Sequence, residues 1–363
     1  MKEVADAAGV STSSVSNAYH RPSKLSSQKR EQILRTAREL GYAGPHPGAS
    51  SLRSGSVGSL GLLLTDSLPY AFEDPATVLL LRGIAQVSQM ANVSLSLLPS
   101  ALPEGRGHHS PPEGPRRRSE LWSAVQRSVV DGFLIYSLPD KHPAVDTALS
   151  RGLPCVVIDA PMRAGIPSVQ IDDERAAGEA AEHLLRLGHR RIGILVDRLV
   201  PDGVHGPVSM SRIQSAVDGV AKARLAGYFA AFRRAGVDES TVPIIEAGGF
   251  LAADSRRAAR MLLAQSRVTA VLASTDVLAL AALEILKQSG KKVPEDVSVV
   301  GFDGLPEAIS AGLSTVIQPL VEKGRLAAEA IIKSVEAYPV NDVLLGTTFH
   351  VGNTTTWAPQ TET

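Results

Sequence analysis

Beyond residue 57, short apolar runs alternate with helical patterns, and this alternation constrains the fold more than any other feature. Parallel strands covered on both faces form near-continuous Val, Ile and Leu runs, and the helices between them supply the covering layers. About 300 residues of this pattern predict two α/β lobes with parallel sheets. The expected strands are Ser59–Thr65, Val93–Leu98, Gly132–Tyr136, Cys155–Ile158, Ile192–Val196, Val242–Glu246, Ala270–Ala273 and Val297–Phe302. The segments 99–119 and 200–215 are rich in Pro, Gly or polar residues and are expected to be loops.

Residues 1–43 follow a different pattern, that of three short helices. The expected helices are Lys2–Ala8, Thr12–Tyr19 and a third that Ser26 caps. Gly9 suits the tight connection between the first two helices because glycine tolerates a positive φ, and Val15 fills the space between them. This spacing is typical of a helix-turn-helix, which places the start of its second helix against base edges in the DNA major groove.

The polar residues of the second helix form two groups of candidate DNA contacts. One group shares an exposed face and can read bases, and the other is better placed to contact phosphates. The first group is Thr12, Ser13 and Asn17, and the second is Ser11, Ser14 and Ser16. The charge distribution agrees, because residues 1–56 carry +4 and the rest of the chain carries −4, although the whole chain is neutral. The pattern alone also allows a small capped helical hairpin that binds protein.

Several motifs in a fixed order extend this interpretation to nearly the whole chain. LSSQKREQILRTARELGY and SLRSG follow the helix-turn-helix, and HLLRLGHRRIGIL, RLAGY, VPEDVSVVGFD and STVIQPL come later. In this set and order the chain resembles the LacI/GalR family of bacterial transcriptional regulators. The resemblance implies an all-α helix-turn-helix head in residues 1–43 and a linker with a hinge helix in 44–56. It further implies an α/β periplasmic-binding-protein-like body of two doubly wound lobes.

The resemblance also implies how the body divides. Three crossover strands join the lobes of such a body, and we place them near Leu187–His189, Val316–Pro319 and Leu345–Thr348. The first lobe would then contain residues 57–188 with 318–346. The second lobe would contain residues 189–317 with 347–363.

By the same resemblance, Leu52 of the hinge inserts between base pairs in the minor groove, and Arg53 is a neighbouring DNA contact. Unstacking of bases by such a wedge costs a few kcal/mol, which contact with the bent DNA offsets. Leu52 could instead dock on the body. Many relatives carry Arg where Asn17 and Ser50 stand, and Asn favours adenine edges, so the operator is expected to depart from the usual consensus of the family.

Candidate effector residues lie where strands end, because ligands of open α/β sheets gather at the carboxyl ends of the strands. The resemblance makes Asp303 and Arg224 the central pair, an acceptor carboxylate and a guanidinium with five donors. The alternative is that these two form a mutual ion pair that braces the cleft. Phe250 either stacks on a sugar or belongs to the core, and segment 200–215 is either a lid or a surface loop. The further candidates are Asp66, Phe72, Tyr136, Asp172, Thr275, Asp276 and Gln318.

The sequence lacks the common motifs of an enzyme. G-x-S-x-G, H-E-x-x-H and the phosphate-binding G-x-x-x-x-G-K-[ST] are absent, and we expect no catalytic site, cofactor or metal. The single cysteine, Cys155, favours the cytoplasm, and no apolar run approaches the roughly 18 residues of a membrane span. The expected function is that of a homodimeric repressor that binds operator DNA under the control of a small-molecule effector. A ligand-binding protein or a sugar-processing enzyme without a DNA role is the alternative.

Overall fold

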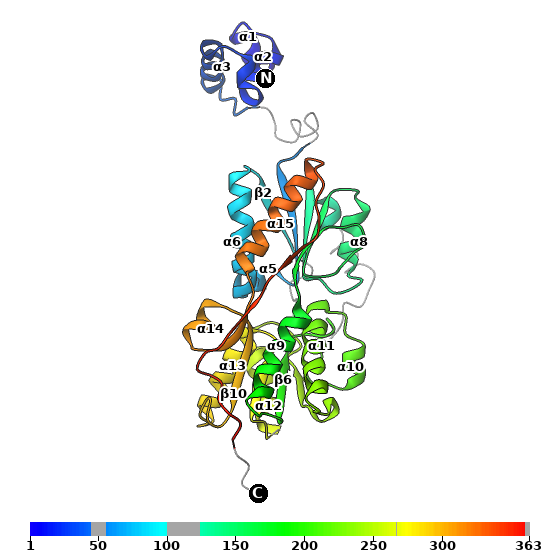
Figure 1. The fold of residues 1–363 in the computed structure, drawn as a ribbon. Helices are drawn as coiled ribbons and strands as arrows, with labels where there is room; N and C mark the ends of the chain where they lie inside the picture. The colour runs from blue at the N-terminus through cyan, green and yellow to red at the C-terminus, as the bar shows by residue number, and fades with distance from the viewer. Residues whose placement is uncertain (45–55, 100–123, 266, 360–363) are drawn as a thin grey trace. The chain divides into compact units, whose positions relative to one another are not determined.

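The computed structural model describes residues 1–44, 56–99, 124–265 and 267–359 (Figure 1). These residues fall into two compact units, Met1–Gly58 and Ser59–Thr363. The first unit is a helical head, and the second is an α/β body that contains two sheets. The predicted fold class is therefore confirmed.

Three helices form the head: α1 (Lys2–Ala7), α2 (Thr12–His20) and α3 (Ser27–Glu39), with a 3-10 turn, η1 (Pro22–Lys24), before α3. Ser11 and Ser26 cap α2 and α3, because their side-chain oxygens accept hydrogen bonds from the first helical turn at 3.1 and 3.3 Å. Apolar side chains from all three helices meet in a small core. Its buried members are Val4, Ala5, Ala8, Val15, Ala18, Ile33 and Ala37.

The first sheet of the body has six strands, and all its strand pairs are parallel. Their order is β12-β5-β4-β3-β1-β2. The helices of this lobe are α5 (Leu68–Glu73), α6 (Pro75–Met90), α8 (Pro143–Ser150) and α15 (Leu320–Val335). The strands are β1 (Ser59–Leu64), β2 (Ser94–Pro99), β3 (Gly132–Tyr136), β4 (Cys155–Ile158), β5 (Ser168–Ile171) and β12 (Val343–Leu345).

The second sheet has seven strands in the order β13-β11-β10-β9-β6-β8-β7, and its two edge strands, β13 and β7, are antiparallel to their neighbours. Its strands are β6 (Ile192–Val196), β7 (Gly206–Pro207), β8 (Ile244–Glu246), β9 (Ala270–Ala273), β10 (Ser298–Asp303), β11 (Ser314–Ile317) and β13 (Thr348–His350). The helices are α9 (Asp173–Arg186), α10 (Met210–Gln214), α11 (Gly219–Arg234), α12 (Ala252–Gln265), α13 (Asp276–Gln288) and α14 (Pro306–Ser310), with a 3-10 turn, η2 (Glu239–Thr241).

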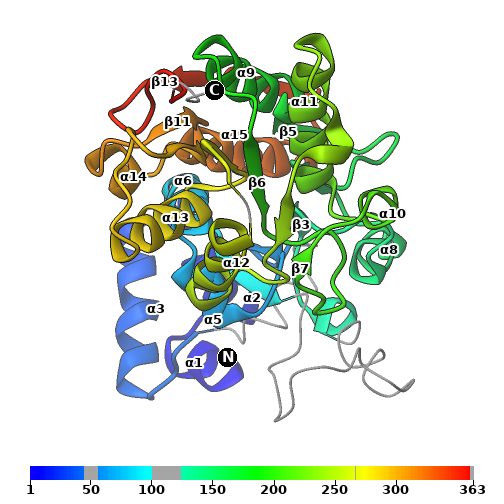
Figure 2. The ribbon, with the colours of Figure 1, turned by 90° about the horizontal axis from the view of Figure 1, so that it is seen from below.

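Glycines allow two helix pairs to approach closely. Helices α6 and α15 lie side by side (Figure 1), and a Cβ on Gly83 would stand 1.9 Å from the backbone oxygen of Val321. Helices α9 and α11 also lie side by side (Figure 2), and a Cβ on Gly227 would stand 2.0 Å from the backbone oxygen of Glu174. Neither contact leaves room for a larger residue, so these glycines allow the close packing within each helix pair.

The first crossover between the lobes lies at Asp172, and its expected position near Leu187–His189 was wrong. Strand β5 ends at Ile171 in the first sheet. Helix α9 begins at Asp173, packs on α11 and belongs to the core of the second lobe. The whole of α9 therefore belongs to the second lobe. The chain passes between the two sheets again after β11 and between β12 and β13.

The segment 200–215 is an ordered part of the second lobe. It contains β7 and α10, and Arg212 holds it to the sheet with hydrogen bonds of 2.8 and 2.9 Å to the buried carboxylate of Glu246. Among the lining residues of the cleft none comes from this segment. Most of the segment 99–119 lies outside the described residues. In the described part of the chain, no helix has the length and apolar character that would let it span a membrane.

Candidate functional site

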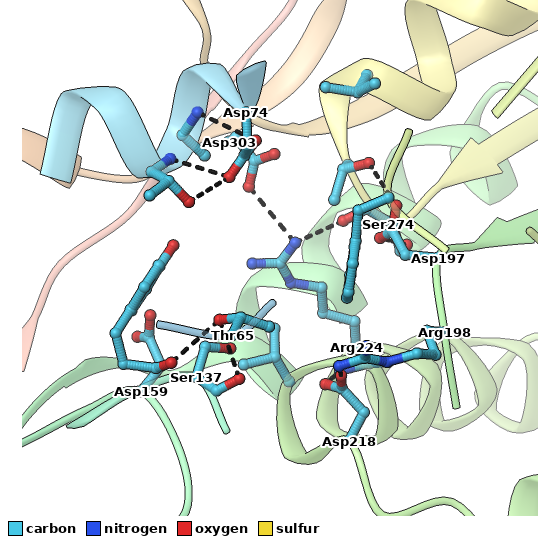
Figure 3. A pocket seen from close by; sticks show the side chains of 18 of the residues that line it. Thr65, Asp74, Ser137, Asp159, Asp197, Arg198, Asp218, Arg224, Ser274 and Asp303 are labelled. Carbon is cyan, nitrogen blue, oxygen red and sulfur yellow. Dashed lines mark hydrogen bonds and ion pairs between the residues drawn. The ribbon is translucent and has the colours of Figure 1, made fainter. Parts of the chain in front are cut away.

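A cavity lies between the two lobes of the body, at the carboxyl ends of strands from both sheets (Figure 3). Including its open mouth, the cavity encloses about 780 Å³ of empty space. Thr65, Asp159 and Ser274 each follow a strand directly, and Asp303 is the last residue of β10. The ends of strands from both sheets thus bring polar side chains to one place, as expected for open α/β sheets.

Arg224 contacts several residues around the cavity. It lies on α11 with only 5% of its surface exposed. Its Nε donates to Asp173 at 2.8 Å, and its Nη1 donates to the backbone oxygen of Ser274 and to Asp303 Oδ1, the latter at 3.4 Å. The guanidinium also lies 3.7 Å from the ring centroid of Phe302. Arg224 and Asp303 therefore form the mutual ion pair of the alternative interpretation, and both also line the cavity.

A chain of hydrogen bonds connects Asp303 to the other lobe. Gln318, on the second crossover, donates to Asp303 Oδ1 at 2.7 Å and accepts from Lys323 Nζ at 2.7 Å. Lys323, on α15, also donates to Asp159 Oδ1 at 2.7 Å. The Lys323 side chain is completely buried, so its ammonium group depends on these oxygens for the hydrogen bonds that water would otherwise supply. These hydrogen bonds link Asp303, at a strand end of the second lobe, to Asp159, at a strand end of the first.

Burial shifts the protonation of the carboxylates around the cavity. It raises the pKa of Asp303 well above the ordinary value, against the opposing effect of Arg224. It also raises the pKa of Asp197 to about 6, although Ser274 and Thr275 donate to this carboxylate at 2.9 and 3.2 Å. Among the described residues, no group of three or more His, Cys, Asp and Glu side chains is arranged to hold a metal ion.

Aromatic side chains form one wall of the cavity. The rings of Tyr70 and Phe250 lie 5.1 Å apart, and the guanidinium of Arg198 lies 4.5 Å from the Phe250 centroid. Tyr136 lines the cavity from the end of β3, and burial raises the pKa of both tyrosines well above 10, so their hydroxyls remain neutral donors. This wall offers apolar surface together with hydroxyl groups, a combination that suits a ligand with both characters.

The structure brings together six of the ten residues proposed from the sequence as effector contacts. These lining residues are Tyr136, Arg224, Phe250, Thr275, Asp303 and Gln318. Four others lie outside the lining. Asp66 accepts a hydrogen bond from Arg198, Phe72 is 63% exposed, and Asp172 caps α9. Asp276 is fully buried behind the cavity, where it accepts from Thr315 at 2.6 Å.

Sequence reasoning missed several lining residues that the same rule about strand ends could have found. Asp159 follows β4, and Asp197 and Arg198 follow β6. Asp74 and Asp218 were harder to find because they cap the helices α6 and α11 rather than end a strand. Lys323, which contacts the lining residues Asp159 and Gln318, could not have been found this way, since a lysine in an amphipathic helix usually faces solvent.

In the head, the exposed face of α2 carries the residues proposed to read bases. Thr12 and Ser13 are exposed, and Asn17 is partly buried one helical turn further along. Ser11 caps the helix, and its oxygen also lies 2.7 Å from the Ser13 oxygen, so its side chain is already engaged within the head. Ser14 and Ser16 are partly buried. Leu52 and Arg53 lie outside the described residues.

Comparisons with known proteins match both units. A model described as bacterial regulatory proteins, lacI family, matches residues 1–44, and one described as a periplasmic binding protein-like domain matches residues 181–355. The HTH-type transcriptional regulator IpsA of Corynebacterium glutamicum is 39% identical over 98% of this chain and 96% of its own length. A solved LacI-family transcriptional regulator from the same organism shares 36% identity and a TM-score of 0.75, over 97% of this chain and 98% of that one. A solved complex of the transcriptional regulator CelR with cellobiose shares 26% identity and a TM-score of 0.65, also over 97% and 98% of the two chains.

Proposed function

The chain belongs to the LacI family of bacterial regulatory proteins and is a DNA-binding transcriptional regulator rather than an enzyme, and from this premise we propose the ligand and mechanism that control it. We propose that two copies form a homodimer in the cytoplasm and repress transcription from a roughly palindromic operator. A polyhydroxy compound, such as a sugar, binds in the cavity of each body and changes the affinity for the operator.

The observation that carries the proposal is the polar composition of the cavity. Each hydroxyl of a sugar both donates and accepts a hydrogen bond. The carboxylates of Asp197 and Asp303 are acceptors for such hydroxyls, and the guanidinium of Arg224 is a donor. The aromatic wall of Tyr70 and Phe250 supplies apolar surface for the C–H faces of a ring. The complex of the relative CelR with cellobiose supports this class of ligand.

The proposed DNA contacts are the residues of the head and hinge. Base edges are read by Thr12, Ser13 and Asn17. The DNA phosphates are contacted by Ser11, Ser14 and Ser16. Leu52 inserts between base pairs in the minor groove, and Arg53 is a neighbouring DNA contact. Two heads would together carry about twice the +4 charge of residues 1–56, which favours binding to a polyanion in a salt-dependent manner.

Control of DNA binding follows from differential affinity. A ligand shifts the protein toward the lobe arrangement that it binds more tightly, and by linkage the operator affinity changes by the same factor as the ligand affinity. The chain of hydrogen bonds from Asp303 through Gln318 and Lys323 to Asp159 joins the lobes across a crossover. We propose that this chain transmits the position of one lobe to the other.

A gel-shift assay with DNA from upstream of the protein's own gene tests the proposal. We expect salt-sensitive, sequence-selective binding that a sugar or polyol alters. Binding that does not discriminate this DNA from a scrambled fragment of equal length would contradict the regulatory role. Selective binding that no sugar or polyol alters would contradict the proposed ligand class alone.

A further inference from the structure

Arg198 is a second guanidinium in the cavity, and its hydrogen bonds are incomplete. It follows β6 and lines the cavity with only 7% of its surface exposed. Its Nη1 donates to Asp66 at 3.3 Å, across the gap between the lobes. Its Nη2 lies 3.7 Å from Asp218 Oδ2, which is an ion-pair distance but too long for a hydrogen bond. Within the part of the chain that the structure describes, neither Nε nor Nη2 has a hydrogen-bond partner.

Buried donors in folded proteins are nearly always satisfied, and an exception calls for an explanation. The guanidinium of Arg198 is held in place by the ring of Phe250 at 4.5 Å and by the carboxylates of Asp66 and Asp218. Phe250 in turn packs against Tyr70. Phe250 therefore has a role as the support of Arg198, beyond the stacking on a sugar that the sequence suggested.

The charge of the cavity limits what this acceptor can be. Five aspartates line it, namely Asp74, Asp159, Asp197, Asp218 and Asp303, whereas Arg198 and Arg224 are the two arginines of the lining. Lys323 lies behind Asp159 and offsets one more charge. Burial raises the pKa of Asp197, Asp218 and Asp303, so the site already disfavours negative charge, and the charge of an anionic ligand would be unfavourable there as well. A cationic ligand would meet two guanidinium groups.

We propose that Arg198 is a ligand-binding residue whose Nε and Nη2 donate to an oxygen of a neutral polyhydroxy ligand. The ligand's own hydroxyls donate to the surrounding carboxylates. The inference deepens the proposed function and rests on it: it adds a ligand contact at the second guanidinium and commits the site to neutral ligands over their carboxylate or phosphate counterparts.

The test compares Arg198→Lys with the wild-type full-length protein. Lysine retains the positive charge beside Asp66 and Asp218, so the contact between the lobes and the folded state are preserved, but it lacks the planar fork of donors. Arg233→Lys is the matched control, because Arg233 lies on α11 with its side chain 62% exposed, and it pairs with Glu239 rather than with the cavity. Thermal shift measurements identify the compounds that stabilise the protein. The neutral compounds are ribose, glucose and cellobiose, and the anionic ones are gluconate, ribose 5-phosphate and glucose 6-phosphate. Calorimetry then gives the Kd of the best one.

We expect a neutral compound to stabilise the wild type, and Arg198→Lys to raise its Kd about 10–100-fold, since two hydrogen bonds from a charged donor are lost. Arg233→Lys should leave this Kd unchanged. Stabilisation by the anionic compounds alone, or an unchanged Kd in Arg198→Lys, would overturn the inference and leave the proposed function standing. If no compound stabilises the wild type or alters its binding to DNA, the proposed ligand class fails, and the inference fails with it.

Discussion

Replacement of Lys323 by methionine should destabilise the body by about 3–5 kcal/mol, because it removes one partner of a buried ion pair. The Lys323 and Asp159 side chains are 1% and 9% exposed, and Nζ donates to Asp159 and to Gln318 at 2.7 Å in both cases. Methionine has a similar length and fills the space. The loss of stability therefore reports on the Asp159 carboxylate and the Gln318 amide oxygen, which are left without the donor. Lys333→Met, on the exposed face of α15, should change stability by less than about 0.5 kcal/mol.

A double-mutant cycle separates the charge from the packing. Asp159→Asn removes the carboxylate, and Lys323→Met combined with Asp159→Asn removes both charges. The double variant should lose only about 1–3 kcal/mol, the cost of the unpaired oxygen of Gln318, although each single change is expected to cost more. Urea unfolding followed by circular dichroism supplies the free energies. If the two single losses add to within about 0.5 kcal/mol in the double variant, the two residues are not coupled and the interpretation is wrong.

Three further predictions address the head, the helix layers and the pH dependence. Asn17→Ala should cost about 1–3 kcal/mol of operator binding at one or two base positions, which a set of operator variants in a fluorescence anisotropy assay would detect; a uniform loss at all positions would indicate a phosphate contact. Gly83→Ala should destabilise the body, as measured by urea unfolding, because its Cβ would stand 1.9 Å from the backbone oxygen of Val321, whereas Gly346→Ala has open space and should not; equal effects would refute the close approach of α6 and α15. Burial raises the pKa of Asp197 to about 6 from an ordinary 3.8, so the folded state holds the proton more tightly and stability should fall as the pH rises from about 4 to 6. Asp197→Asn should reduce this fall between pH 4.5 and 6.5, and an unchanged slope would contradict the assignment.

Most of the fold could be predicted from local sequence patterns. The eight expected strands all exist, and apart from the edge strand β2 each is a largely apolar run that is buried in its sheet. Five strands were not predicted, namely β5, β7, β11, β12 and β13, and each has only two to four residues. Such short segments carry too little pattern to be distinguished from loops, and pairing with distant neighbours determines them.

The error at the first crossover has a different origin. The helical pattern of α9 was recognised, but nothing within the helix indicates which sheet it covers. Its assignment to the second lobe depends on Gly178 and Gly227, which allow α9 and α11 to approach, and on buried residues such as Leu184 that meet Phe302 in one core. These contacts join positions more than 40 residues apart, and no periodicity reveals them.

The candidate site was predicted in part for the same reason. Arg224 and Asp303 were found from motifs, and the rule that ligands bind at strand ends accounts for Thr275 and Tyr136. The role of Lys323 could not be predicted, because its partners Gln318 and Asp159 come together only in the folded body. A charged residue in that environment is not visible in the sequence, since its partners lie 5 and 164 positions away.

The central claim is that a ligand in the cavity of the body controls the binding of the head to DNA. The direct test is the anisotropy of labelled DNA from upstream of the protein's own gene, titrated with the wild type and with Asp303→Asn in the presence of the neutral compound that stabilises the wild type. The account predicts a ligand-dependent change in operator affinity of at least about 5-fold for the wild type, and the same unliganded affinity without the response for Asp303→Asn. An equal response in both proteins would contradict the assignment of the site, and no response in the wild type would contradict the coupling itself.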